Sequence, residues 1–292
     1  MDVPHRLAPA DVTVDALATF IAAHAIVLLL ASSALALVAA ALVWNGIERG
    51  APRLLGFAAP LWRRIDRRRI AARYLGLQAL VFIAVAAVGA MIFVELADEI
   101  APDEDLGQFD LALSMALRES LSATTLRFFS LLTHLGDFEV LAPLVAVSAA
   151  LLFWRRHALL ASTLLFTTTG AALLNDGLKR VFERARPEFV HEFAHVSGFS
   201  FPSGHSAGSL AVYGTLAYVA VRLLPRRWHL TCVAFAMTLI VFVGASRVLL
   251  QVHFFSDVLG GWAGAATWTS LCVAALEAWR LSGVRRAAAP AQ

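Results

Sequence analysis

Residues 158–187 read ALLASTLLFTTTGAALLNDGLKRVFERARP. The part up to residue 178 is mostly apolar, and a helix that crosses the hydrocarbon core of a membrane needs about 20 such residues. Basic residues follow at once, beginning with Lys179, and the stretch ends at Pro187. The pattern predicts a transmembrane helix that carries a cluster of positive charge at one end.

The rest of the chain has the composition of a membrane protein. Its 292 residues are 59% hydrophobic and 15% charged, whereas a typical soluble domain has about 25% charged residues. The net charge of +3 does not indicate nucleic-acid binding, because the basic residues flank apolar runs, where they set the orientation of the spans. Cys232 and Cys272 lie inside apolar runs and predict neither a disulfide framework nor a metal site.

Six further apolar runs predict an all-α polytopic membrane helical bundle, with a six-span core and one extra N-terminal span. The expected spans cover residues 17–44, 75–96, 138–154, 158–178, 206–224, 230–246 and 256–279. The first run is read as a retained span, because a positively charged region before it, typical of a signal peptide, is missing. Residues 108–133 mix apolar and polar side chains and predict one or two amphipathic helices at the interface.

The arginines predict which side of the membrane each connection faces. Short arginine-bearing loops lie at residues 49–73, 155–157 and 225–229, and such loops are cytoplasmic as a rule. Seven alternating spans place all three loops and the C-terminus on the cytoplasmic side. We therefore divide the chain into residues 1–74, an N-terminal span with an arginine-rich cytoplasmic loop, and residues 75–292, the core domain.

This topology leaves one basic cluster on the outer side, where basic residues are least expected. It contains Lys179, which is the only lysine in the chain, and its companions are Arg180, Arg184, Arg186 and Arg247. Charges close to the hydrocarbon core are costly and are usually functional. The cluster predicts an anionic partner, for which phosphate is the obvious choice.

Three short polar segments should meet on the outer side because each lies at the end of a span. They are KRVFERARP at 179–187, PSGH at 202–205 and SRVLLQVHFFSD at 246–257. Arginine forks match phosphate oxygens in pairs. Ser203 and the backbone N–H of Gly204 open a helix, where unpaired amides favour an anion.

Two histidines in these segments can act as nucleophile and acid near neutral pH. His253 and Asp257 are four residues apart, so on a helix the carboxylate lies beside the imidazole. Asp257 could then hold the Nδ1 proton and leave Nε2 of His253 ready to attack. His205 is the second histidine.

This arrangement resembles the type 2 phosphatidic acid phosphatase superfamily, whose pattern is Lys-x6-Arg-Pro, Pro-Ser-Gly-His and Ser-Arg-x5-His-x3-Asp. The resemblance implies that His253 attacks phosphorus and forms a phosphohistidine, and that Asp257 orients it. It implies that His205 protonates the leaving group and then activates water, with neither metal nor cofactor. The residues that hold the phosphoryl oxygens are, by the same resemblance, Lys179, Arg186, Ser203, Gly204 and Arg247.

The resemblance therefore implies an integral membrane lipid phosphatase, with residues 75–292 as the phosphatase domain. Candidate substrates are phosphatidic acid, phosphatidylglycerol phosphate, undecaprenyl pyrophosphate and lipid A phosphates. We expect a bacterial inner membrane, with the active site facing the periplasm or exterior. The alternatives are a lipid phosphotransferase of the same superfamily and a transporter or receptor that binds an anion without turnover. The oligomeric state stays open.

One segment of the outer loop indicates a different chemistry. Residues 191–195 read HEFAH and match the zincin signature His-Glu-x-x-His. That chemistry needs both histidines on one face of a helix, together with a third ligand. The segment lies between Pro187 and Pro202, with little room for a long helix, and Phe201 stands where the third histidine of a metzincin would be. We therefore favour the phosphatase.

Overall fold

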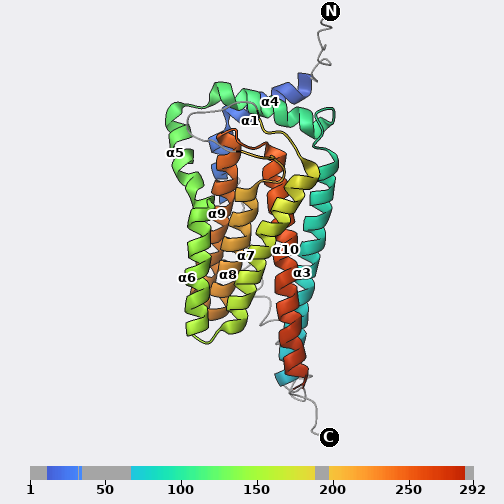
Figure 1. The fold of residues 1–292 in the computed structure, drawn as a ribbon, viewed down its shortest axis with the longest axis vertical. Helices are drawn as coiled ribbons and strands as arrows, with labels where there is room; N and C mark the ends of the chain where they lie inside the picture. The colour runs from blue at the N-terminus through green and yellow to red at the C-terminus, as the bar shows by residue number, and fades with distance from the viewer. Residues whose placement is uncertain (1–11, 32, 35–66, 188–196, 287–292) are drawn as a thin grey trace, which may run out of the picture.

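Six long helices form the body of the molecule in the computed structural model, which describes residues 12–31, 33–34, 67–187 and 197–286. They are α3 (Arg67–Asp98), α6 (Phe138–Trp154), α7 (Ala158–Phe182), α8 (Gly204–Leu223), α9 (His229–Leu249) and α10 (Phe255–Arg286). Figure 1 shows them running roughly along one axis as a bundle. The described part of the chain contains helices and no strand, so the predicted all-α core of six spans is confirmed.

The central helix of the bundle is α8, which contacts α6, α7, α9 and α10. It is the one core helix that lacks a long, uniformly apolar window. Its small polar residues Ser206, Ser209 and Thr215 are fully buried, and small residues allow neighbouring helices to approach closely. The sequence of α8 thus fits a helix that is surrounded by protein rather than by lipid.

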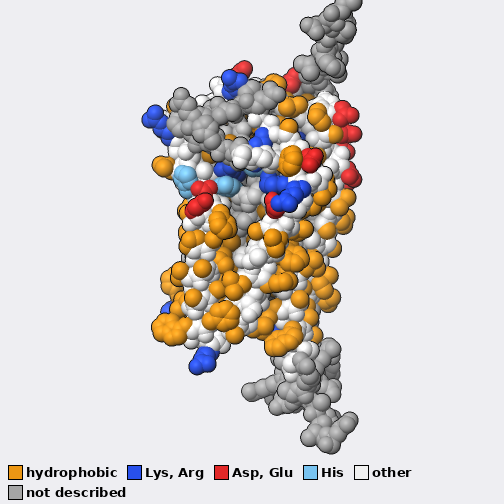
Figure 2. All heavy atoms as spheres, viewed as in Figure 1, with side chains coloured by type: hydrophobic (Ala, Val, Ile, Leu, Met, Phe, Trp, Pro, Cys, Tyr) orange, Lys and Arg blue, Asp and Glu red, His pale blue; other side chains and the backbone are white. Residues whose placement is uncertain are grey.

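A hydrophobic core holds these helices in register. Its members come from α6 to α10 and include Leu164, Val212, Ile240 and Leu276. On the outside, Figure 2 shows hydrophobic side chains along the length of the bundle and charged ones mainly at its two ends. This core packing brings the C-terminal ends of α7 and α9 and the N-terminal ends of α8 and α10 to one end of the molecule (Figure 1).

Two shorter helices, α4 (Asp105–Ser120) and α5 (Ala123–Thr133), occupy the mixed region predicted to be amphipathic. The buried positions of α4 include Gly107, Asp110, Leu113 and Leu117, which lie on one face of the helix. Figure 1 shows α4 lying across the end of the bundle. The short 3-10 helices η1 (His134–Gly136) and η2 (Arg226–Trp228) precede α6 and α9, respectively.

The N-terminal segment differs from a straight span. The helix α1 (Val12–Ala23) packs on α4, where Ala18 and Ala22 are buried, and the chain bends by 74° before the next helical piece, Ala25–Ala31. The later part of the predicted span at 17–44, from residue 35 on, and most of the arginine-rich loop lie outside the described residues. The extra N-terminal span and the domain boundary at residue 74 therefore stay predictions; helix α3 begins earlier, at Arg67.

Candidate active site

The three predicted segments meet at one end of the bundle, and backbone hydrogen bonds join them. The N–H of Ser203 donates to the carbonyl of Asp257 at 2.9 Å, and the N–H of Ser200 donates to the carbonyl of Arg184 at 2.8 Å. Helix α7 ends at Phe182, and its C-cap residue Glu183 has a left-handed φ of 46°, which turns the chain out of the helix. Residues 184–187 can therefore cross over the start of α10.

His253 and Asp257 form a buried pair. Their side chains are 2% and 0% exposed, and His253 Nδ1 lies 3.2 Å from Asp257 Oδ2. Helix α10 begins only at Phe255, so the expected helical spacing does not account for the contact. The Phe254 N–H donates to Asp257 Oδ2 at 2.9 Å and turns the carboxylate back toward the residue that precedes the helix.

The proton positions on His253 follow from its second partner. Arg186 Nη1 lies 3.0 Å from His253 Nε2, and because a guanidinium only donates, Nε2 accepts. Nδ1 then carries the hydrogen and donates it to Asp257. Burial lowers the pKa of His253 to about 3, although Asp257 acts in the opposite direction. The imidazole is therefore neutral at physiological pH, with its lone pair on Nε2.

Lys179 and Arg186 lie beside this pair and bind the loop that precedes Ser203. Lys179 Nζ donates to the carbonyls of Phe199 and Ser200 at 2.6 and 3.1 Å. Arg186 donates from Nε to the carbonyl of Gly198 at 2.8 Å and from Nη1 to the carbonyl of Val252 at 2.7 Å. Arg186 therefore connects the loop to His253.

Arg247 is the deepest cation of the site. Its side chain is almost fully buried, and Nη1 donates to Thr133 Oγ1 at 2.8 Å. Its Nε is buried and has no hydrogen-bond partner among the described residues. A buried donor without a partner is costly. An anion in the site would supply the missing acceptor.

Ser203 and Gly204 lie at the beginning of α8, as predicted. Ser203 is the N-cap residue and is fully buried, and its Oγ accepts a hydrogen bond from Ser206 Oγ at 3.1 Å. The N-terminal amides of a helix of this length favour a negative charge. His205, one residue further on, makes a contact with Asp137: the two atoms, Nε2 and Oδ1, are 2.7 Å apart.

Arg184 is the centre of a hydrogen-bond network that the three sequence motifs did not predict. Arg184 Nη1 donates to Asp257 Oδ1 at 2.8 Å, and Nη2 donates to Asp110 Oδ2 at 3.0 Å. The N–H of Ser256 donates to Asp110 Oδ1 at 3.1 Å, and burial raises the pKa of Asp110. Ser200 Oγ donates to the same carboxylate oxygen of Asp257 as His253 does.

A sequence signal for Asp110 did exist. Gly107, Asp110, Ser114 and Leu117 recur at helical spacing in the mixed segment, and all four are buried in α4. An acidic residue on the buried face of an amphipathic helix needs a cation, and Arg184 is the partner that the fold provides.

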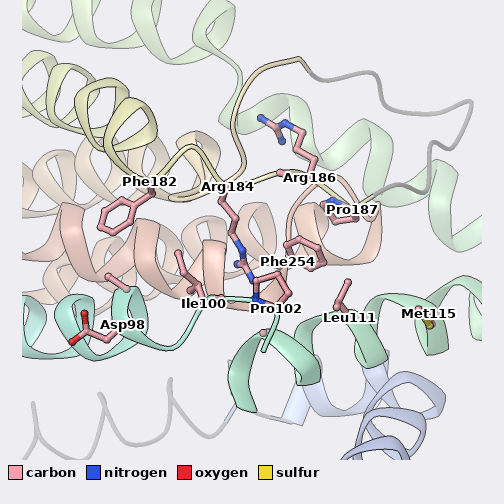
Figure 3. A pocket seen from close by; sticks show the side chains of 14 residues that line it. Asp98, Ile100, Pro102, Leu111, Met115, Phe182, Arg184, Arg186, Pro187 and Phe254 are labelled. Atoms are coloured by element: carbon pink, nitrogen blue, oxygen red, sulfur yellow. The ribbon is translucent and has the colours of Figure 1, made fainter. Parts of the chain in front are cut away.

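A cavity of about 570 Å³ lies beside the site, between the end of α3, α4 and the residues that follow α7. Its walls are mainly apolar, as Figure 3 shows. The labelled apolar residues are Ile100, Pro102, Leu111, Met115, Phe182, Pro187 and Phe254. Arg184 and Arg186 also line the cavity. In Figure 3 the side chain of Arg184 points into the cavity, whereas that of Arg186 points away from it, toward His253.

The zincin-like segment at residues 191–195 lies outside the described residues. Within the ranges that the structure describes, no three side chains of the types that bind metals form a group that could hold an ion.

Fold and site together define a class: a helical membrane protein with a buried histidine–aspartate pair beside clustered cations at one end. The chain belongs to the PAP2 superfamily, whose sequence profile matches residues 160–280. It is similar to the crystal structure of a transmembrane PAP2 type phosphatidylglycerolphosphate phosphatase from Bacillus subtilis, with a TM-score of 0.58 and 31% sequence identity. That match covers 71% of this chain and 98% of the other. The family resemblance and the membrane location are thus confirmed.

Two curated relatives are phosphatases by name. Phosphatidylglycerophosphatase B of Bacillus subtilis (strain 168) is 41% identical over 132 residues, which are 44% of this chain and 64% of the relative. A Lipid A 1-phosphatase of Rhizobium johnstonii is 38% identical over 120 residues, 38% of this chain and 45% of the relative. The chain therefore spans less than two thirds of the length of these relatives.

Proposed function

We propose that this protein is a lipid phosphatase that hydrolyses a phosphomonoester or pyrophosphate on a membrane lipid, through a phosphohistidine on His253. The observation that carries the proposal is the buried, neutral His253, whose Nε2 accepts a hydrogen bond while Asp257 holds Nδ1. Nε2 carries the lone pair for attack, and Arg186 must release its hydrogen bond to Nε2 before this atom reaches phosphorus. The phosphatase names of two relatives support the same activity.

The reaction has two halves. His253 Nε2 attacks phosphorus, the bond from phosphorus to the lipid oxygen breaks, and His205 gives its proton to that oxygen. Water then attacks the phosphohistidine, the phosphorus–nitrogen bond breaks, and His205 takes the proton of the water. Lys179, Arg186 and Arg247, with the helix start at Ser203 and Gly204, stabilise the charge on the phosphoryl oxygens.

The substrate is an amphiphile because the site combines cations with an apolar cavity. Phosphate would lie at Arg186, and the first part of the lipid would occupy the cavity that Arg186 also lines. Phosphatidic acid, phosphatidylglycerol phosphate and undecaprenyl pyrophosphate share this chemistry. The site faces the periplasm or exterior of a bacterial inner membrane, because the loops with Arg155 and Arg226 lie at the other end of the helices that lead to it.

Phosphate release from a panel of lipid phosphates tests the activity. We expect the purified protein in detergent to release phosphate from at least one of the candidate lipids, and orthovanadate to inhibit it as a phosphate mimic. EDTA should leave the rate unchanged. A protein that binds these lipids but releases no phosphate would be a transporter or receptor. Transfer of the phosphate to a second lipid, without release, would indicate the phosphotransferase alternative. Activity lost with EDTA and restored by zinc would contradict the proposal.

Narrowing the cavity tests whether it holds lipid. Leu111→Trp adds bulk to the cavity wall, so we expect KM for a long-chain lipid phosphate to rise about tenfold, which corresponds to about 1.4 kcal/mol. KM for p-nitrophenyl phosphate, which has no chain, should not change. The matched control is Leu131→Trp, on the exposed surface of α5. Equal KM changes for both substrates would contradict the assignment of the cavity.

A further inference from the structure

A second histidine–aspartate pair lies in the site, and its carboxylate belongs to none of the three motifs. His205 Nε2 is 2.7 Å from Asp137 Oδ1, and His134 Nδ1 is 2.6 Å from Asp137 Oδ2. Each oxygen of the carboxylate thus meets one imidazole. The side chains of His205 and Asp137 are 22% and 27% exposed, whereas His134 is 61% exposed. Asp137 therefore lies between a partly buried histidine and a solvent-exposed one.

The turn that carries Asp137 is fitted closely to α8. A Cβ atom on Gly136 would come within 2.9 Å of His205 Cδ2 and 2.5 Å of Val243 Cγ1, so only glycine permits this approach. The hydroxyl of Tyr213, two turns along α8 from His205, donates to the carbonyl of Leu135 at 2.6 Å. Three consecutive residues of the turn therefore contact side chains of α8: Leu135 contacts Tyr213, and Gly136 and Asp137 contact His205. The packing of the turn on α8 thus fixes the position of Asp137 beside His205.

This contact decides which nitrogen of His205 can exchange a proton. The Asp137 carboxylate only accepts, so Nε2 carries a hydrogen and donates it. The proton that is gained and lost must then be on Nδ1. The Cδ2 edge of the ring faces Gly136, and Nδ1 is on the opposite edge, away from the turn. Burial, together with the charges of Arg247 and Arg186, lowers the pKa of His205 to about 4, and Asp137 acts in the opposite direction, so loss of Asp137 would disfavour the protonated form further.

We propose that Asp137 is the positioning residue of the acid–base histidine, and that His134 and Gly136 hold Asp137 and the ring in place. The inference rests on the proposed phosphatase function, in which His205 is the acid. The two pairs are arranged alike. In each, an aspartate carboxylate accepts a hydrogen bond from one ring nitrogen, Nε2 of His205 or Nδ1 of His253, and the other nitrogen takes part in the reaction. Asp137 neither touches the substrate nor gives up a proton of its own.

The proton balance of the reaction makes the proposal specific. In the first half, the Nδ1 proton of His205 goes to the leaving oxygen as the bond to phosphorus breaks. In the second half, water adds to phosphorus, the bond to His253 Nε2 breaks, and the proton of the water returns to Nδ1. Loss of Asp137 should therefore harm reactions that need a proton on the leaving group, and spare the first half for a leaving group that needs none.

Two phosphate esters with different leaving groups test this. We expect Asp137→Asn to lower kcat on an alkyl lipid phosphate by about 30-fold to 100-fold, since general acid catalysis contributes about 10² to 10⁴. With 2,4-dinitrophenyl phosphate, whose leaving phenolate needs no proton, the rate of the first burst of dinitrophenolate should fall less than about threefold. Asp137→Glu should recover part of the alkyl ester rate. Glu139→Gln, an exposed carboxylate two residues away, is the matched control and should equal the wild type.

Gly136→Ala provides a second variant that leaves the charge of Asp137 intact. Its added methyl must displace the ring of His205 or Val243, so the same selective loss on the alkyl ester is expected. Equal losses on both esters, in Asp137→Asn and in Gly136→Ala, would mean that the turn only supports the fold, and would overturn the proposal. An Asp137→Asn protein that matches the wild type on both esters would overturn it as well. A wild type that hydrolyses neither ester would refute the proposed function itself.

Discussion

His253→Gln is expected to lower phosphate release from a lipid phosphate by about 10⁴-fold or more, because it removes the nucleophile of a reaction that proceeds through a covalent intermediate. Glutamine keeps a polar side chain of similar length, so Arg186 and Asp257 retain a partner. The measurement is phosphate release by the purified variant in detergent, under conditions in which the wild type turns over.

Trapping of the intermediate gives this prediction a second readout. After a short reaction with substrate labelled in its phosphate, denatured wild-type protein should carry label that is stable in base and lost in acid, as expected for a phosphoramidate. The variant should carry none. His229→Gln, at a partly buried histidine of the opposite end of the bundle, is the matched control. Phosphate release by His253→Gln at more than about a tenth of the wild-type rate would exclude His253 as the nucleophile.

The sequence was sufficient to predict the helices of the core and the motifs that meet at one end. Apolar length determines a span, and alternation of spans determines which ends share a side. The result is that Lys179 and His253 come together although they are 74 positions apart in the chain. The same reasoning expected His253 and Asp257 on one helix, whereas α10 begins two residues after the histidine. The contact still forms because the Phe254 N–H donates a hydrogen bond to the Asp257 carboxylate and holds it beside His253.

Side-chain partners across the bundle could not be predicted in the same way. Asp137 precedes α6 and Asp110 lies on the buried face of α4, but neither position indicates its partner, and the partners His205 and Arg184 are about 70 residues away. Pairing at that distance depends on how α4, η1 and α8 pack, which no local periodicity encodes. The 74° bend after α1 has the same origin, since apolarity alone does not distinguish a span from a helix that packs on α4.

Arg184→Met is expected to destabilise the protein by about 3 to 5 kcal/mol, because it leaves two buried carboxylates without their cation. Arg184 binds Asp257 at 2.8 Å and Asp110 at 3.0 Å, and both carboxylates are fully buried. Its guanidinium also lies 4.5 Å from the ring centre of Phe254. Activity should fall too, because Asp257 loses one of the groups that fix it beside His253. The measurement is the thermal unfolding midpoint in detergent, together with phosphate release.

A neighbouring arginine provides the matched control for this effect. Arg180 pairs with Asp176 at 2.6 Å, but both side chains are largely exposed, and an exposed pair contributes about 0 to 1 kcal/mol. Arg180→Met should therefore unfold close to the wild type. Adding Asp110→Asn to Arg184→Met should restore part of the lost stability, because one uncompensated charge is removed. If Arg184→Met unfolds at the same temperature as Arg180→Met, the network around Asp110 does not hold the site together, and Asp257 must be fixed by Ser200 and the Phe254 amide alone.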